Sequence, residues 1–169
     1  FEGQALHHDH VDNTFYRGYK VACAALYRGG KFGVLESMLE YSSKLDACQQ
    51  AFARMCEHDL APDVFLFDAW YAAAALFATI ERLGKVYITR LRSNRVVIFE
   101  NGRPSLRALT VAIDHEEYTR VRIDGRSFWV LDVLLDLNDL GTQRVLICKD
   151  SVFAEPIFLS TNSRNFSAK

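Results

Sequence analysis

The sequence predicts an α/β domain, and three observations support this fold class. The chain has 169 residues, which is enough for one domain with a sizeable hydrophobic core. Half of the residues are apolar and 24% are charged, as in ordinary globular proteins. Between residues 19 and 92, short apolar segments are followed by amphipathic ones, a pattern typical of strands and helices in a layered α/β fold.

Composition limits the function classes. The net charge of −1 gives no global argument for nucleic-acid binding, so any DNA contact would depend on a local patch. No apolar run approaches the roughly 20 residues that cross a bilayer, and we expect no membrane partner. The four cysteines form no C-x-x-C pair, which favours reduced thiols in a cytosolic protein over a zinc site. Because the chain begins with Phe1, we expect it to be part of something longer.

The N-terminal part contains one clear local signal, a β-hairpin. Residues 1–18 are polar and histidine-rich, and we expect them to form a loop or an irregular extension. Residues 19–27 and 32–39 are predicted strands. Gly29-Gly30 between them supplies the positive φ angles of a tight turn.

Two predicted helices then alternate with two predicted strands. Residues 43–56 have apolar side chains at helical spacing, with Ser43 as the expected N-cap. Residues 63–68 form a short apolar run that is typical of a strand buried on both faces. A second helix over 71–83 and a strand over 86–91 complete a predicted parallel strand-helix-strand crossover.

The remaining sequence is rich in predicted strands and polar turns. Asp124-Gly125 predicts a hairpin, residues 106–113 a short helix, and residues 143–148 and 156–160 later strands. We therefore expect three parts: a partial core over 1–92, a β-rich insertion over 93–150, and a last core strand with a tail over 151–169. The final strand is a candidate to rejoin the core sheet.

Asp68 is the strongest candidate for chemistry. It follows a predicted strand directly, and ligands of open α/β sheets bind beyond the carboxyl ends of the parallel strands. A carboxylate at that place is suited to a hard cation such as Mg²⁺. The spacing fits equally well with Asp68 as the cap of the helix that follows.

A second group of candidates follows the next parallel strand. Arg90, Arg92 and Arg95, with Asn94 between them, lie where that strand ends, near the edge that carries Asp68. Arginine at such a position is suited to contacts with phosphate, and the alternative is a solvated strand end.

Two further clusters have metal-ligand residue types without suitable spacing. Residues 7–10 (His-His-Asp-His) lack the periodicity that would converge the side chains on one ion, and we expect a loop. Residues 114–117 (Asp-His-Glu-Glu) follow no buried strand, and we expect a charged, solvated turn.

Four short blocks in order resemble one family. Phe67–Tyr71 resembles the D-[SA]-W-[FY] signature of cut-and-paste insertion-sequence transposases, which have a ribonuclease-H-like DDE catalytic domain. Leu91–Arg95 is similar to the L-K-S-N-R strand end of that family, and Ile157–Asn162 to the strand before its last catalytic helix. Glu2-Gly3 and the histidines after it are similar to its approach to the second strand, although Tyr19 replaces the usual histidine.

The resemblance implies a ribonuclease-H-like mixed sheet flanked by helices, and metal-dependent cleavage and strand transfer of DNA. Such enzymes hold two divalent ions, Mg²⁺ or Mn²⁺, with three carboxylates. Asp68 matches the second carboxylate, and we expect the other two, together with the first strand of the sheet, outside this chain. Arg90, Arg92, Asn94 and Arg95 would contact transposon-end DNA. The resemblance also implies a homodimer and a prokaryotic, cytoplasmic, nucleoid-associated protein.

Two other hypotheses stay open. The chain could be a remnant without chemistry that binds DNA or assists assembly through residues 90–95 and the β-rich insertion. It could also be an unrelated α/β phosphohydrolase. The sequences that flank this chain in its gene would separate the first two hypotheses. On its own, we expect the chain to show no nuclease or strand-transfer activity, since one carboxylate cannot hold two metal ions.

Overall fold

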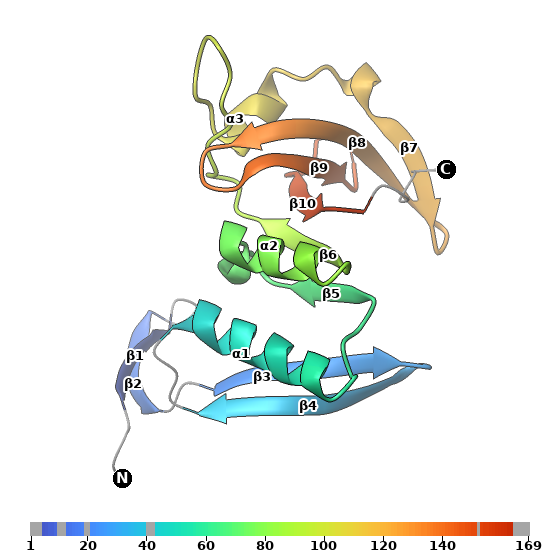
Figure 1. Cartoon of the computed structure of the whole chain (residues 1–169). Coiled ribbons are helices and arrows are strands. Elements are labelled where there is room, and N and C mark those ends of the chain that lie inside the picture. Colours follow the sequence, from blue (N-terminus) through green and yellow to red (C-terminus); the bar gives the residue numbers. More distant parts are fainter. Residues whose placement is uncertain (1–4, 10–12, 19–20, 40–42, 152, 164–169) are drawn as a thin grey trace. The chain divides into compact units, whose positions relative to one another are not determined.

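The computed structural model describes residues 5–9, 13–18, 21–39, 43–151 and 153–163 (Figure 1). The chain divides into two compact units, residues 1–62 and residues 63–169. Both contain helices and strands, so the prediction of an α/β protein is confirmed at this level. Among the described residues, no helix is long and apolar enough to cross a membrane.

The first unit opens with a strand pair that the sequence did not predict. Strand β1 (Ala5–Asp9) pairs antiparallel with β2 (Thr14–Gly18), so the expectation of an irregular segment over residues 1–18 is wrong for these residues. Asn13 lies between them with a φ of 51°, a left-handed conformation that asparagine tolerates better than most residues. A pair held by backbone hydrogen bonds between polar segments has no hydrophobic periodicity, which explains why the pattern did not reveal it.

The predicted hairpin is confirmed. Strands β3 (Val21–Arg28) and β4 (Lys31–Leu39) pair antiparallel and form a two-stranded sheet of their own. Gly29 and Gly30 make the turn with φ angles of 58° and 80°, which only glycine adopts without steric cost.

The predicted helix after the hairpin is also confirmed. Helix α1 (Lys44–Glu57) begins after Ser43, whose hydroxyl oxygen accepts a hydrogen bond from the backbone N–H of Asp46 at 3.0 Å. This cap satisfies one of the N–H groups that the first helical turn leaves without an intrahelical partner. The buried side of the helix carries four apolar residues at helical spacing: Ala47, Ala51, Phe52 and Met55.

The second unit is built on one six-stranded mixed sheet with the order β5-β6-β10-β9-β8-β7. Strand β5 (Val64–Phe67) is parallel to β6 (Val86–Leu91), and helix α2 (Ala74–Arg82) connects them, which confirms the predicted crossover. The helix begins three residues later than expected, because a single 3₁₀ turn, η1 (Ala69–Tyr71), follows β5 first.

Strand β5 differs from its prediction in burial. Phe65 is buried, but Val64 and Leu66 are 38% and 74% exposed. The expectation of a strand buried on both faces is therefore wrong. Within the part of the chain that the structure describes, β5 lies at the edge of the sheet and pairs with β6 alone. An apolar run of this length does not say whether a strand is central or at an edge.

The other four strands are antiparallel to their neighbours. Strand β7 (Thr119–Ile123) forms the predicted hairpin with β8 (Arg126–Leu137), and β8 continues into β9 (Gly141–Lys149). Strand β10 (Ile157–Thr161) inserts between β9 and β6, so the last strand rejoins the sheet. The predicted short helix is α3 (Leu106–Val111), and η2 (His115–Glu117) is a second 3₁₀ turn.

The sheet has an apolar core, and three of its polar side chains form a hydrogen-bonded group. Leu76 and Ile80 of α2, with Val145 and Ile147 of β9, have no accessible surface. Beside them, the Tyr87 hydroxyl donates to Oε1 of Gln143 at 2.6 Å, and the Ser160 hydroxyl donates to the same oxygen at 3.1 Å. These bonds link β6, β9 and β10 and satisfy groups that would be costly to bury unpaired.

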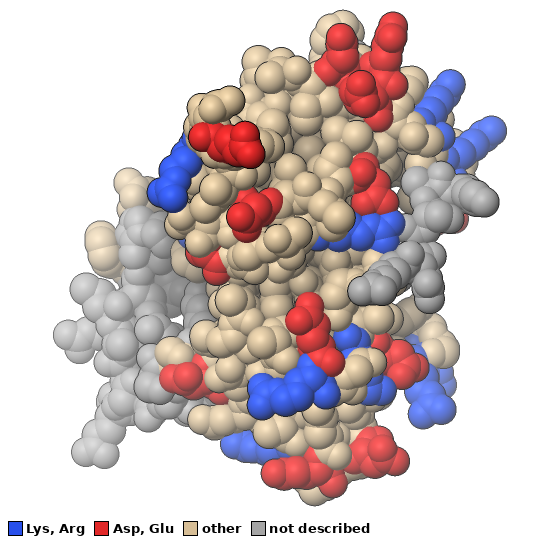
Figure 2. Space-filling model, turned by 45° about the horizontal axis from the view of Figure 1, so that its top comes forward, with Lys and Arg blue, Asp and Glu red and all other residues tan. Residues whose placement is uncertain are grey.

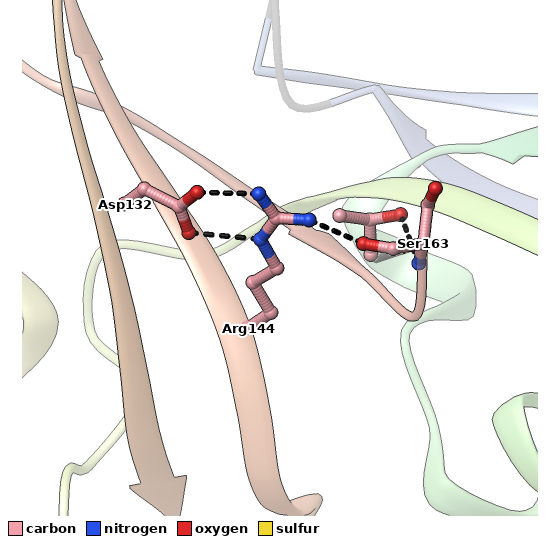
Figure 3. Close-up of polar contacts among 4 residues, drawn as sticks. Asp132, Arg144 and Ser163 are labelled. Atoms are coloured by element: carbon pink, nitrogen blue, oxygen red, sulfur yellow. Dashed lines mark hydrogen bonds and ion pairs between the residues drawn. The ribbon is translucent and has the colours of Figure 1, made fainter. Parts of the chain in front are cut away.

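An ion pair fixes the end of β10 (Figure 3). The Arg144 guanidinium on β9 donates two hydrogen bonds to the Asp132 carboxylate on β8, with Nε 2.9 Å from Oδ1. It also donates to the backbone oxygen of Ser163, which follows β10. The fork of the guanidinium thus ties three consecutive strands of the sheet together.

Candidate nucleic-acid interface

The backbone at Asp68 makes it the cap of a turn. Its Oδ1 accepts a hydrogen bond from the backbone N–H of Ala69 at 2.6 Å, and its backbone oxygen accepts from Tyr71 at 2.9 Å. The prediction that Asp68 caps the following α-helix is therefore wrong, because Asp68 caps the 3₁₀ turn η1 and the N-cap of α2 is Ala73. The side chain is exposed at the carboxyl end of β5. A role as a metal ligand stays a prediction.

The parallel pairing of β5 with β6 sets where the arginines lie. Phe67 is in register with Thr89, so Asp68 and Arg90 follow at the same edge of the sheet. The Thr89 hydroxyl donates to the backbone oxygen of Phe67 at 2.9 Å and holds the two strand ends together. Arg90 is exposed on β6, opposite Leu159 of β10.

Arg92 and Trp70 connect the two strand ends through their side chains. The guanidinium carbon of Arg92 lies 3.8 Å from the centroid of the Trp70 ring, within the range of a cation–π interaction. Both side chains are exposed, Trp70 at 57%. Residues that the sequence predicted from two separate motifs are thus in direct contact.

Arg95 has a different environment from Arg92. Its side chain is 11% exposed, and its guanidinium donates to the Asp139 carboxylate and to the backbone oxygen of Ala72. Asp139 belongs to the turn between β8 and β9. Arg95 therefore ties the segment after β6 to the end of η1 and to that turn. Its Nε is buried and has no hydrogen-bond partner among the described residues.

These side chains surround a pocket of about 430 Å³ in the second unit. Three segments line it: η1 with its C-terminal neighbour, the segment after β6, and the β8–β9 turn. The lining residues are Ala69, Trp70, Ala72, Arg92, Asn94, Arg95, Val96, Asn138 and Asp139. Two arginines and one aspartate give the lining a charge of +1. Asp68 precedes the first lining residue and is not part of the wall.

One face of the molecule has a mixed surface charge (Figure 2). On the face shown in Figure 2, acidic and basic side chains are interspersed, in keeping with the net charge of −1. Among the described residues, the face shown in Figure 2 has no excess of basic side chains that would attract DNA over a long range. A DNA contact would therefore depend on local groups such as Arg92.

The two other clusters from the sequence belong to other elements than those that line the pocket. His7, His8 and Asp9 lie on β1 in the first unit, and His10 lies outside the described residues. In the second cluster, residues 114–117, the three acidic side chains are exposed at η2: Asp114, Glu116 and Glu117. His115 of this cluster packs edge-on against Trp129, with ring centroids 4.3 Å apart. That arrangement agrees with a charged turn.

No group of three or more His, Cys, Asp or Glu side chains that could hold a metal is found among the described residues. One exposed carboxylate does not hold two divalent ions. The described residues therefore do not by themselves fit the two-metal centre that the resemblance implies, and Asp68 would be one ligand of several.

Sequence reasoning missed the contribution of the β8–β9 turn. Asn138 and Asp139 were recognisable only as turn residues. Their place beside Arg95 depends on the insertion of β10 between β6 and β9, which brings distant segments together. No local pattern carries that information.

Comparisons of the chain with protein-family models, with curated proteins and with solved structures find no match.

Proposed function

We propose that the chain is part of the catalytic domain of a DNA transposase, with a ribonuclease-H-like core and Asp68 as one of its metal-binding carboxylates. The observation that supports this most is the edge where β5 and β6 end. There, the exposed Asp68 follows β5, and Arg92, whose guanidinium carbon lies 3.8 Å from the centroid of the Trp70 ring, follows β6. Metal-dependent phosphoryl transfer uses carboxylates that hold the metal and cationic groups that contact the phosphate, and this edge carries one residue of each type.

Two features of the topology support the core that we propose. An antiparallel hairpin precedes a helix, and a parallel strand-helix-strand unit follows in sequence. The outer edge of β5 carries no strand among the described residues. A further strand from the parent protein would occupy that edge under this proposal, and the same protein would supply the remaining carboxylates for Mg²⁺ or Mn²⁺.

The test compares Asp68 with a carboxylate at the other end of the same strand. The parent protein, expressed with its flanking sequences, should cleave DNA that carries the ends of its own element when Mg²⁺ is present. Asp68→Ala should lower that rate by more than the roughly 10- to 100-fold lost when a group that only hydrogen-bonds to a metal ligand is removed.

Asp63→Ala is the matched control. Asp63 is 98% exposed just before β5 and pairs with Lys85 at 3.1 Å, so its removal leaves the carboxyl end of the strand untouched. Equal activity of the Asp68→Ala and Asp63→Ala proteins would contradict the role of Asp68. Asp68-dependent cleavage by the 169-residue chain alone would contradict its assignment as an incomplete part.

A second candidate function is a DNA-binding or assembly module without chemistry. The pocket favours it, because two arginines line it and Asp68 does not. Under this alternative, the parent protein binds element-end DNA as a dimer but does not cleave it, and Asp68→Ala leaves the affinity unchanged. Electrophoretic mobility shifts with sedimentation of the complex would measure both properties.

A further inference from the structure

The pocket beside Trp70 combines three kinds of group. It offers a guanidinium 3.8 Å from the centroid of an aromatic ring, two carboxamides from different segments, and a wall held by Arg95, whose side chain is 11% exposed. We propose that this pocket holds one unpaired base of the DNA. The inference rests on the proposed function, since it takes DNA as the ligand and names the part of it that the pocket recognises.

The stacking surface is the outer face of the Arg92 guanidinium. Its inner side lies 3.8 Å from the centroid of the Trp70 ring, and the residue is exposed. Nucleic-acid-binding proteins stack unpaired bases on guanidinium planes as well as on aromatic rings. A base would therefore extend the existing pair into a stack of three planar groups.

The carboxamides provide hydrogen bonds for the edge of the base. Asn94 follows β6 and Asn138 belongs to the β8–β9 turn, and both are exposed in the pocket. Each carboxamide has a donor and an acceptor, as do the edges of the bases. In a duplex the Watson–Crick edge is already paired, so only an unpaired base can use these groups.

The size of the pocket agrees with a single nucleotide. Its volume of about 430 Å³ falls within the range of about 300–1,000 Å³ that is typical of small-ligand sites. A duplex is excluded from such a space. The surplus charge of +1 in the lining is suited to the one phosphate that accompanies each base.

The backbone around the pocket is held in place before any ligand binds. The N–H groups of Leu106 and Arg107, at the start of α3, donate to the backbone oxygens of Arg95 and Ser93 at 2.8 and 2.9 Å. The N–H of Asn138 donates to the backbone oxygen of Val96 at 3.0 Å. Arg95 thus acts as a positioning residue, because it fixes both carboxamide-bearing segments and lowers the cost of ordering them on binding.

The experiment measures whether the chain prefers unpaired DNA and whether Arg92 causes that preference. Trp129→Phe leaves Trp70 as the single tryptophan of the chain, so quenching of its fluorescence reports events at the pocket. The probes are a short single-stranded oligonucleotide and the same sequence fully paired. We expect quenching by the single strand and an affinity on the order of 10-fold higher than for the duplex.

Arg92→Ala should reduce this ratio of affinities to about one, and Asn138→Ala should reduce it in part. Arg122→Ala is the matched control, because Arg122 is exposed on β7 and carries the same charge outside the pocket. That variant should retain the ratio.

Equal affinities for the two probes would overturn the inference while leaving DNA binding intact. Retention of the preference in Arg92→Ala would overturn it as well, since the preference would then arise elsewhere. A chain that binds neither probe would overturn both this inference and the DNA-binding part of the proposed function.

Discussion

The hairpins β3–β4 and β8–β9 follow the same local rules and differ in what surrounds them. Each reverses through glycine at positive φ, Gly29 and Gly30 in the first and Gly141 in the second. In the first hairpin, the facing rings of Tyr27 and Phe32 have centroids 4.7 Å apart and are 60% and 80% exposed. In the second, β9 buries Val145 and Ile147 completely.

The difference lies in the neighbouring strands. Strands β8 and β9 are bordered by β7 and β10, so the hairpin sits inside a six-stranded sheet. Among the described residues, β3 and β4 pair only with each other. An isolated two-stranded hairpin is marginally stable in water, and further strands or a packed helix supply the missing burial. Turn chemistry thus decides that a hairpin forms, whereas its neighbours decide how stable it is.

The largest effect should come from removing apolar volume inside the second hairpin. Ile147→Ala should lower the free energy of unfolding of residues 63–169 by about 2–5 kcal/mol, because the side chain is fully buried and a cavity remains. Both tryptophans, Trp70 and Trp129, lie in this unit, so urea unfolding followed by tryptophan fluorescence reports it selectively. Val34→Ala on β4 is the control, since Val34 is 71% exposed, and hydrogen exchange at the amides of β3 and β4 measures its effect because residues 1–62 contain no tryptophan. Similar losses of unfolding free energy in the two variants would contradict the conclusion that the two hairpins differ in burial.

A smaller effect is expected at the polar group that joins the second hairpin to β6. Tyr87→Phe removes the hydroxyl that donates to Gln143 and should cost about 1 kcal/mol at neutral pH. Burial, with a smaller contribution from the charge of Glu81, raises the pKa of Tyr87 to about 12. In the unfolded chain tyrosine loses its proton near pH 10.

The sign of the pH dependence follows from these two values. Below about pH 10 the stabilisation from the protonated Tyr87 is fully present, and it is lost as the pH rises through about 12. The slope is about 1.4 kcal/mol per pH unit within that window. Urea unfolding at several alkaline pH values should show a less steep loss of stability in Tyr87→Phe than in the unsubstituted chain. Parallel curves for the two proteins would show that Tyr87 titrates as an ordinary exposed tyrosine.

The sequence predicts the elements of this fold where local chemistry determines them. Gly29-Gly30 marked the first hairpin, Ser43 marked the start of α1, and Asp124-Gly125 marked the β7–β8 turn. Each depends on residues within a few positions of one another. By contrast, the edge position of β5 and the pairing of β1 with β2 depend on which strands meet, and no short pattern contains that information.

The candidate site likewise has features that local sequence patterns predict and features that depend on which strands pair. Asp68 and Arg92 were recognisable because each follows a strand and the two strands were expected to be parallel. The sequence did not show that Arg95 is held by Asp139 and by the backbone of Ala72, because these residues are brought together only by the sheet order. Arg92 and Arg95 lie three positions apart and look equivalent in sequence, yet only Arg92 is exposed.

The smallest effect should come from the exposed face of the first hairpin, and it tests whether that face is free in solution. Phe32→Ser should change the stability of residues 1–62 by no more than about 0.5 kcal/mol, since the ring is 80% exposed and its removal creates no cavity. Hydrogen exchange at the amides of β3 and β4 would measure it, because this unit contains no tryptophan. A loss above about 1 kcal/mol that grows with protein concentration would mean that a second molecule covers this face. The exposure of Tyr27 and Phe32 would then mark an assembly surface, and the two hairpins would differ in their partner, not in their degree of burial.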